Sequence, residues 1–184
     1  MRVITGTARG AKLYTLDNEH IRPTIERIKE AEFSAIQFYV QGAKVLDIFA
    51  GTGQMGIEAL SRGASEAVFV DNDDEAIKLI RRNLTKTKLQ DKARVVKNDA
   101  FRYLASLRRE FDIVFCDAPY RLGIPARILS VISEHISESG FVLFETELSV
   151  TLPEMVDELS LNKTYRYGKT MIWMYRKKLS EDME

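Results

Sequence analysis

A glycine-rich turn in the first third of the chain has the spacing of a nucleotide-binding loop. It follows an apolar run and spans Leu46 to Gly56, with the sequence Leu-Asp-Ile-Phe-Ala-Gly-Thr-Gly-Gln-Met-Gly. Glycines let a ligand approach the backbone closely, and the helix expected after the turn offers free N–H groups. Gly51, Gly53 and Gly56 satisfy the dinucleotide fingerprint, so the spacing alone is compatible with a nicotinamide or flavin cofactor.

A carboxylate inside the apolar run argues against a dinucleotide. Asp47 would repel a pyrophosphate, but it suits a ligand that carries an ammonium group. S-adenosylmethionine has both an α-amino group and a sulfonium, so we expect it to be the cofactor. Asp71, at the end of the next strand, can bind ribose hydroxyls of either cofactor and does not discriminate between them.

A third polar segment, Asn98-Asp99-Ala100, follows the next expected strand. It is placed where an adenine amine could be recognised, although Asp99 is equally suited to cap the helix that follows. The residues expected to bind the cofactor are Asp47, Phe49, Ala50, Gly51, Thr52, Gly53, Asp71, Asn72, Asp99 and Ala100.

The second chemical motif is Asp117-Ala118-Pro119-Tyr120, at the end of the apolar run Phe111–Cys116. Ligands of open α/β sheets bind outside the carboxyl ends of the strands, which is where this tetrapeptide is expected. The exocyclic amine of a base is a poor nucleophile, because its lone pair is delocalised into the ring. The Asp117 carboxylate and the Ala118 carbonyl can accept the amine hydrogens and free the lone pair. Pro119 favours an extended Ala118, and Tyr120 offers a face for base stacking.

The elements that must position these motifs alternate between strands and helices from Lys44 onward. This alternation predicts a parallel sheet with helices on both faces, closed by an antiparallel hairpin through Gly168. The expected fold is α/β and Rossmann-like, with seven mostly parallel strands. The expected strands are 44–50, 67–71, 94–97, 112–116, 141–145, 162–167 and 171–176, and the expected helices are 54–62, 74–86, 101–107, 125–135 and 153–159.

A separate N-terminal piece precedes this sheet. Residues 1–14 are expected to form a small hairpin that turns near Gly6–Gly10, and Thr24 is expected to cap a helix that runs to about Val40. The piece is too small for a core of its own and should dock on the main domain. We therefore divide the chain into an N-terminal extension, 1–42, and a main domain, 43–184, which the glycine turn and Asp47 lead us to expect to be a methyltransferase domain.

Charge is balanced over the whole chain but not along it. Twenty-seven basic and twenty-seven acidic side chains give no net charge, so the global charge does not indicate a nucleic-acid partner. The first sixteen residues hold basic but no acidic side chains, and we expect no other stretch before Lys163 to concentrate positive charge as well. The residues expected to contact RNA are Arg2, Arg9, Lys12, Arg22, Thr24 and Arg27. The alternative is that Arg22 and Arg27 tie the extension to the main domain.

Several classes of protein are disfavoured by the composition. The single cysteine, Cys116, excludes an internal disulfide and lies in an apolar run, which predicts a buried, inert thiol. His20 and His135 are too isolated for a metal site, and none is expected. The apolar runs are too short to span a bilayer, and Arg2, Arg9 and other basic residues interrupt any signal peptide. We expect a cytoplasmic monomer.

The chain resembles the RsmD-type bacterial methyltransferases, which make N2-methylguanine in 16S ribosomal RNA. The resemblance covers nearly all of the chain. It rests on the segments 2–6 and 9–13, Arg22-Pro23-Thr24 with Arg27, Glu30-Ala31, 46–56, 58–64, Asn83-Leu84, Asp99-Ala100 and 111–120. It implies methyl transfer from S-adenosylmethionine to a guanine N2 in 16S ribosomal RNA, at nucleotide 966 in the family, within a partly assembled small subunit.

One departure from the family pattern concerns the second motif. The family has Asp-Pro-Pro-Tyr or Asp-Pro-Pro-Phe, whereas this chain has Ala118 at the first proline, so a ring no longer fixes φ there. Three alternatives stay open: an adenine-N6 methyltransferase acting on DNA or another RNA, an NAD-dependent oxidoreductase, and an RNA-binding module without activity. The Ala118 substitution favours the last, and Asp47 opposes the second.

Overall fold

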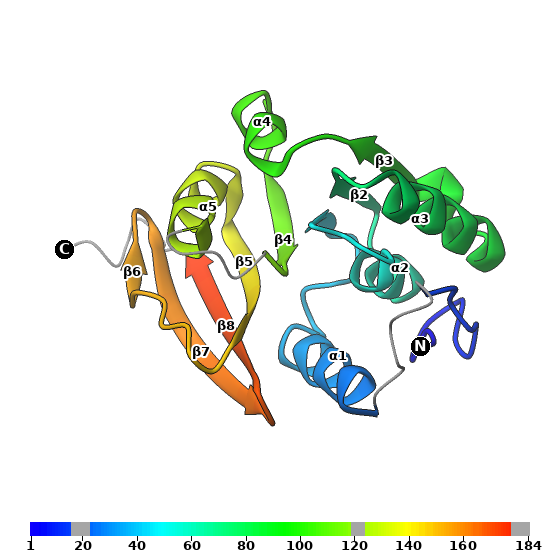
Figure 1. Cartoon of the computed structure of the whole chain (residues 1–184), viewed down its shortest axis with the longest axis horizontal. Helices are drawn as coiled ribbons and strands as arrows, with labels where there is room; N and C mark the ends of the chain where they lie inside the picture. The colour runs from blue at the N-terminus through cyan, green and yellow to red at the C-terminus, as the bar shows by residue number, and fades with distance from the viewer. Residues whose placement is uncertain (16–22, 119–123, 178–184) are drawn as a thin grey trace.

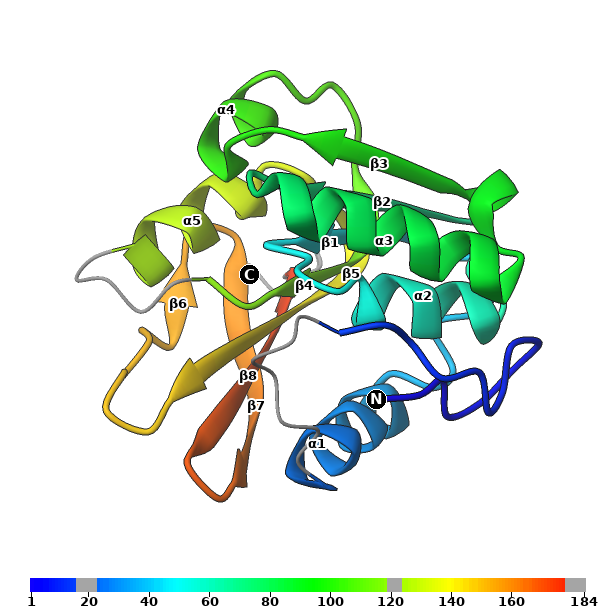
Figure 2. The same cartoon turned by 45° about the vertical axis from the view of Figure 1, so that its right-hand side comes forward.

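An eight-stranded sheet organises the described part of the chain, and Figures 1 and 2 show how the strands and the helices around them are arranged. The computed structural model describes residues 1–15, 23–118 and 124–177. The strand order is β3-β2-β1-β4-β5-β8-β7-β6. The strands are β1 (Lys44–Ile48), β2 (Glu66–Asp71), β3 (Ala93–Lys97), β4 (Phe111–Cys116), β5 (Ile136–Glu147), β6 (Met155–Val156), β7 (Leu159–Tyr167) and β8 (Thr170–Lys177).

The first five strands are parallel. β2 and β3 are added on one side of β1, and β4 and β5 are added on its other side. β1 pairs with both β2 and β4, so the carboxyl ends of β1 and β4 lie side by side at the centre of the sheet. Strand β8 then inserts antiparallel between β5 and β7, which are its two partners. The point between β1 and β4 is a topological switch point, where open α/β sheets place their ligands.

Helices cover both faces of the sheet and enclose two apolar cores. One core packs α1 (Pro23–Ala35), α2 (Gln54–Ser61) and α3 (Asp74–Thr87) against the sheet, and the other packs α4 (Ala100–Ala105) and α5 (Ile124–Ser133). A short 3-10 turn, Gln90–Lys92, follows α3. Each strand in the centre is buried on both faces, which explains its continuous apolar sequence. The α/β class, the mostly parallel sheet and the C-terminal hairpin are confirmed.

Three details of the prediction are wrong. The segment 153–159 is not a helix, because β6 and the start of β7 occupy it and add an eighth strand to the seven expected. Its apolar side chain Leu159 is fully buried in the second core, so tertiary packing outweighs local helical propensity. Helix α1 ends at Ala35 rather than near Val40, and it begins at Pro23, so Thr24 lies inside the first turn instead of capping it.

The N-terminal segment forms a short antiparallel pair that docks on α2. A bridge joins Arg2 to Lys12, and the backbone N–H of Val3 donates to the carbonyl of Ala11 at 3.0 Å. The apolar side chains of Met1, Val3 and Leu13 are buried in the same core as the three helices. As expected for a piece without its own core, the segment packs on the sheet domain. The helices of the described segments are all too short or too polar to span a bilayer.

Candidate active site

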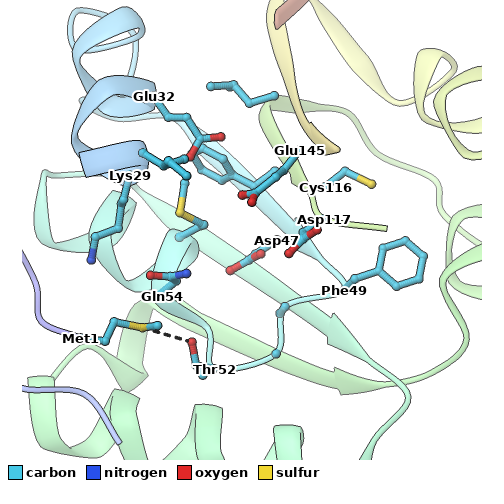
Figure 3. Close-up of a pocket in the computed structure, with 16 residues that line it drawn as sticks. Met1, Lys29, Glu32, Asp47, Phe49, Thr52, Gln54, Cys116, Asp117 and Glu145 are labelled. Carbon is cyan, nitrogen blue, oxygen red and sulfur yellow. Dashed lines mark hydrogen bonds between the residues drawn. The ribbon is translucent and has the colours of Figure 1, made fainter. Parts of the chain in front are cut away.

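A cavity of about 190 Å³ lies at the carboxyl ends of β1 and β4 (Figure 3). The turn after β1 forms one wall of the cavity, and residues of α1 and β5 form other walls. This volume is below the range of about 300–1,000 Å³ that is usual for small-molecule sites, so it suits one end of a cofactor. The described lining residues are Met1, Ile28, Lys29, Glu32, Asp47, Phe49, Ala50, Gly51, Thr52, Gln54, Met55, Phe115, Cys116, Asp117, Leu143 and Glu145.

The glycine turn reverses the chain sharply before α2. Phe49, Gly51 and Gly53 have φ values of 60°, 52° and 74°, all in the left-handed region that glycine adopts without strain. The N–H of Gly51 donates to Asp71 Oδ2 at 2.8 Å, so the turn is held by the end of β2. A Cβ at Gly56 would lie 2.3 Å from the Phe69 ring. The third glycine of the fingerprint is therefore required by packing of α2 on the sheet.

Asp47 lies at the base of the cavity and is 4% exposed. Its Oδ2 accepts a hydrogen bond from the N–H of Gly56 at 2.9 Å. Burial raises the pKa of this carboxyl to about 8, the Gly56 N–H opposes the rise, and the charges of Asp71 and Asp117 add to it. A bound cation would relieve this cost of ionisation, because an opposite charge favours the carboxylate.

Two further carboxyl groups of the cavity were not predicted from the sequence. Glu32 extends from α1 and Glu145 from β5, and Figure 3 shows them facing Asp47 and Asp117. Burial, followed by the charges of Glu145, Asp117 and Asp47, raises the pKa of Glu32 well above its usual range. Burial and then Asp117 raise the pKa of Glu145 to about 7. This acidic cavity therefore gathers four carboxyl groups, and Glu32, Asp47 and Glu145 bind protons more tightly than exposed carboxyls do.

The sequence carries a weak signal for this acidic cluster. Glu32 is a charged residue between apolar neighbours on the buried face of a helix. Glu145 directly follows the apolar run Phe141–Phe144 within β5, next to the strand that precedes Asp117. Either position would normally be apolar, so a buried carboxyl there is a reason to look for function.

The second motif is only partly within the described residues. Asp117 follows β4 directly and lines the cavity, while Ala118 is 1% exposed and packs in the second core. Pro119 and Tyr120 lie outside the described residues. Cys116 is 2% exposed, and burial raises the pKa of its thiol well above the usual range, so the predicted buried thiol is confirmed.

The structure brings only part of the expected cofactor set into the cavity. Asp47, Phe49, Ala50, Gly51 and Thr52 line it, and Gly53 lies next to them as the first residue before α2. The remaining four residues lie at the end of β2 or after β2 and β3, and they are outside the lining: Asp71, Asn72, Asp99 and Ala100.

These four lie along the same edge of the sheet, because β3, β2 and β1 are adjacent and parallel. The Asp71 carbonyl accepts from the N–H of Asn98 at 3.0 Å, which joins the ends of β2 and β3. Asp99 caps α4, since its Oδ1 accepts from the N–H of Arg102 at 3.0 Å. Asp99 thus caps the helix that follows it, which is the second role that its position in the sequence allowed.

The residues expected to contact RNA are spread over the N-terminal segment. Arg9, Lys12 and Arg27 are exposed. Arg2 is exposed as well, but its Nε lies 3.3 Å from the carboxylate of Glu26 on α1. Arg22 lies outside the described residues, and only the backbone of Thr24 is described. Within the described ranges, no group of three or more His, Cys, Asp or Glu side chains has an arrangement that could hold a metal ion.

Known proteins resemble this chain over nearly its whole length. The family model described as conserved hypothetical protein 95 matches residues 1–176. "Putative rRNA methyltransferase YlbH" of Bacillus subtilis (strain 168) is 39% identical over 97% of this chain and its own full length. "Ribosomal RNA small subunit methyltransferase D" of Escherichia coli (strain K12) is 31% identical over 96% of this chain and 90% of its own. The solved structure of "Putative methyltransferase yhhF from Escherichia coli" superposes with a TM-score of 0.87 at 28% identity, over 98% of this chain and 99% of that one.

Proposed function

The chain belongs to the family of conserved hypothetical protein 95, that of ribosomal RNA small subunit methyltransferase D, and we propose that it methylates the exocyclic N2 of a guanine in 16S ribosomal RNA. The methyl donor is S-adenosylmethionine. One observation carries the proposal: Asp47 at the glycine turn and Asp117 at the end of β4 line one cavity. The expected cofactor loop and the expected acceptor of the base amine are therefore adjacent.

The cavity has the chemistry that the methionine end of S-adenosylmethionine requires. Asp47 and its acidic neighbours suit an ammonium and a sulfonium, and Gln54 Oε1 is buried without a hydrogen-bond partner among the described residues. Free N–H groups at the start of α2 suit the carboxylate end. Asp71 binds the ribose hydroxyls, and Asn72, Asp99 and Ala100 extend the site toward the adenine. When bound, this cofactor supplies an electrophilic methyl group.

The protein contributes positioning and hydrogen-bond acceptors to the chemical step. Asp117 and the Ala118 carbonyl accept the two hydrogens of the guanine amine, which turns the nitrogen lone pair toward the methyl group. Pro119 and Tyr120 complete the motif, with the Tyr120 ring stacked on the base. The base must leave its stack to reach the cavity, as in other enzymes that modify bases. The proton lost by the amine passes to Asp117 or to water.

The substrate is 16S ribosomal RNA in a partly assembled small subunit, with the guanine equivalent to nucleotide 966 as the target. The protein acts as a monomer in the cytoplasm. Residues 1–42 form the RNA-facing extension, and 43–184 form the methyltransferase domain. Because Glu32 and Met1 also line the cavity, the extension contributes to the active site as well as to RNA binding.

A methylation assay tests this function. The purified protein is incubated with methyl-labelled S-adenosylmethionine and small subunits from cells that lack the gene, and the RNA is then digested to nucleosides. We expect label in N2-methylguanosine, at one site by mass spectrometry. Label in N6-methyladenosine would establish the adenine alternative, and calorimetric binding of NAD instead of S-adenosylmethionine would establish the oxidoreductase.

A further control separates catalysis from binding. Protein that binds both S-adenosylmethionine and RNA but transfers no label to either base would be a binding module without activity. Restoring the gene to the deleted cells should restore the same modified nucleoside, which links the activity in vitro to the modification in vivo.

A further inference from the structure

A shallow groove of about 430 Å³ lies on the surface of α3, away from the acidic cavity. It is lined by one aromatic side chain from the N-terminal segment and four residues of α3: Tyr14, Arg81, Arg82, Thr85 and Lys86. None of these residues belongs to the sets expected to bind the cofactor or RNA. The groove combines three cations with an aromatic residue, Tyr14, that is 41% exposed.

Tyr14 is held over α3 by its backbone. Its N–H donates to Asn83 Oδ1 at 2.7 Å, and its carbonyl accepts from Asn83 Nδ2 at 3.1 Å. The Tyr14 ring then meets the Arg82 guanidinium at 4.3 Å and the Lys86 ammonium at 4.2 Å from its centroid. Two of the three cations of the groove, Arg82 and Lys86, are thus held against the Tyr14 ring.

The same asparagine connects the groove to the proposed cofactor site. Asn83 Nδ2 also donates to the carbonyl of Thr52 at 3.0 Å, and Thr52 lines the acidic cavity. One buried side chain therefore links the wall of the groove with the glycine turn. A ligand in the groove would therefore bind to a surface that Asn83 joins by hydrogen bonds to the wall of the cavity.

The charge of this surface is more concentrated than that of the N-terminal arm. The stretch 76–90 contains five basic side chains, Lys78, Arg81, Arg82, Lys86 and Lys88, and no acidic one. The expectation that the first sixteen residues concentrate positive charge best is therefore wrong. Among the described residues, Arg81, Arg82 and Lys86 form no ion pair, whereas Lys78 is paired with Glu75.

We propose that this groove, Tyr14 with Arg81, Arg82, Thr85 and Lys86, binds the phosphate backbone of the substrate RNA. The proposal rests on the proposed function, because it assigns a second contact surface to the same substrate. Unpaired arginines and lysines recognise phosphate oxygens by charge and hydrogen bonding. A chain without net charge needs such local surfaces to hold RNA, and the exposed part of the Tyr14 ring adds a stacking surface.

The alternative is a purely structural role, in which Arg82 and Lys86 only fix Tyr14 and so dock the N-terminal segment. Arg81 distinguishes the two roles, because it lines the groove, whereas Arg82 and Lys86 are the cations that lie over the Tyr14 ring. Loss of Arg81 should leave docking intact and remove one phosphate contact.

The experiment measures the equilibrium dissociation constant for a 16S ribosomal RNA fragment containing the methylated site, over a series of salt concentrations. Arg81→Ala is compared with the triple variant Arg81→Ala, Arg82→Ala, Lys86→Ala. The matched control is Lys78→Ala, a charge change of equal size on the same helix but outside the groove. Thermal stability and S-adenosylmethionine affinity are measured for each protein.

We expect the log–log salt slope to become shallower by roughly 0.7–0.9 for Arg81→Ala and by roughly two to three times as much for the triple variant. The triple variant should bind RNA at least about tenfold more weakly near physiological salt, while Lys78→Ala keeps the slope of the original protein. An unchanged slope for Arg81→Ala would overturn the proposal, even if the triple variant proves unstable.

Failure of this inference differs from failure of the proposed function. If the original protein methylates the RNA but the groove variants keep its affinity and salt slope, only the groove is wrongly assigned. If the original protein binds the RNA through the groove but labels no guanine, the proposed chemistry fails and the groove stands. If the original protein does not bind the RNA at all, the groove assignment fails as well.

Discussion

Asp47 is a buried carboxyl group whose neighbours include two other acidic side chains, Asp71 and Asp117. Its raised pKa means that the folded protein without ligand holds a proton there at neutral pH more readily than an exposed aspartate does. Such a group is unfavourable for stability but suited to a cationic ligand, a combination that is common at binding sites. The charge cost at one residue therefore supports function rather than folding.

Asp47→Asn should stabilise the ligand-free protein at alkaline pH. The folded-state pKa of Asp47 is about 8, above the ordinary value of 3.8. The contribution of Asp47 to the free energy of unfolding is therefore fully present below about pH 4 and is lost as the pH rises toward 8. Asparagine can keep the bond from Gly56 and never ionises. We expect a melting temperature higher by roughly 2–8 °C at pH 8, which corresponds to about 1–2 kcal/mol, and a smaller difference at pH 5.

The same variant should bind S-adenosylmethionine more weakly by about 1–3 kcal/mol in titration calorimetry, because a charge-assisted contact is lost. If the difference in melting temperature between the two proteins stays constant from pH 5 to pH 8, Asp47 does not titrate as the structure implies. Unchanged affinity would remove it from the cofactor site.

Asp117→Ala should affect turnover and leave cofactor affinity largely intact. The side chain is proposed to accept a hydrogen of the base amine, a contact that matters in the transition state. Loss of such a charge-assisted bond costs about 2–3 kcal/mol, or roughly 30- to 150-fold in rate. Single-turnover methylation and calorimetry measure the two quantities separately. A variant with a near-normal rate would rule out the acceptor role.

Side chains of α2 bind the backbone of the N-terminal segment and so determine how the two meet. Glu58 of α2 is fully buried and accepts from the N–H groups of Ile4 and Thr5 at 2.8 and 3.0 Å. Ser61 Oγ donates to the Thr5 carbonyl at 2.6 Å. Lys29, from α1, lies 3.3 Å from the same Glu58 carboxylate. One helix thus fixes both parts of the extension by hydrogen bonds and charge.

Gly6→Ala should loosen this docking much more than Gly10→Ala does. Both glycines have positive φ, 87° and 82°, so alanine is strained at either position. At Gly6 the added Cβ would also lie 1.8 Å from the Ser61 carbonyl oxygen, whereas nothing lies within 4 Å at Gly10. We expect about 1 kcal/mol of destabilisation at Gly10 and roughly 2–4 kcal/mol at Gly6.

Chemical denaturation measures both free energies of unfolding, with Gly10→Ala as the control for backbone strain alone. The Gly6 variant should also become susceptible to proteolysis within the first fifteen residues. Equal losses of stability in the two variants would mean that the contact with Ser61 gives way at little cost.

The whole molecule separates its buried carboxyl groups from a set of exposed basic side chains, although the chain has no net charge. Four carboxyl groups line the cavity at the carboxyl ends of β1 and β4, while basic side chains occur on the N-terminal segment and on α3. This separation suits a protein that binds a cationic cofactor inside and a polyanion outside. Because the two sites differ in burial, salt should screen RNA binding far more than cofactor binding.

Changing Arg9 and Lys12 together to alanine should weaken RNA binding without affecting stability. Both side chains are exposed, and neither forms an ion pair among the described residues. We expect the log–log salt slope to become shallower by roughly 0.7–0.9 for each lost contact. Cofactor affinity and melting temperature should hardly change. A double variant that is less stable but retains the salt slope would assign the N-terminal arm to structure.

The sequence by itself determined the order of elements and the motifs at their ends. The glycine turn, Asp47 and Asp117 were identifiable because strands buried on both faces are continuous apolar runs, and because polar residues directly after them lie at one edge of a parallel sheet. The expected bounds of the helices and strands after β1 agree with the observed ones within a few residues, with two exceptions: β5 begins five residues before the expected 141, and 153–159 joins the sheet edge.

Only the tertiary structure decided which distant residues share a site. Glu32 and Glu145 lie far apart in the chain and enter the cavity because α1 and β5 pack around the ends of β1 and β4. Tyr14 meets Arg82 and Lys86 because Asn83 binds its backbone. Periodicity encodes which face of an element is buried, but the pairing of elements arises from long-range packing, whose partners a local pattern does not specify.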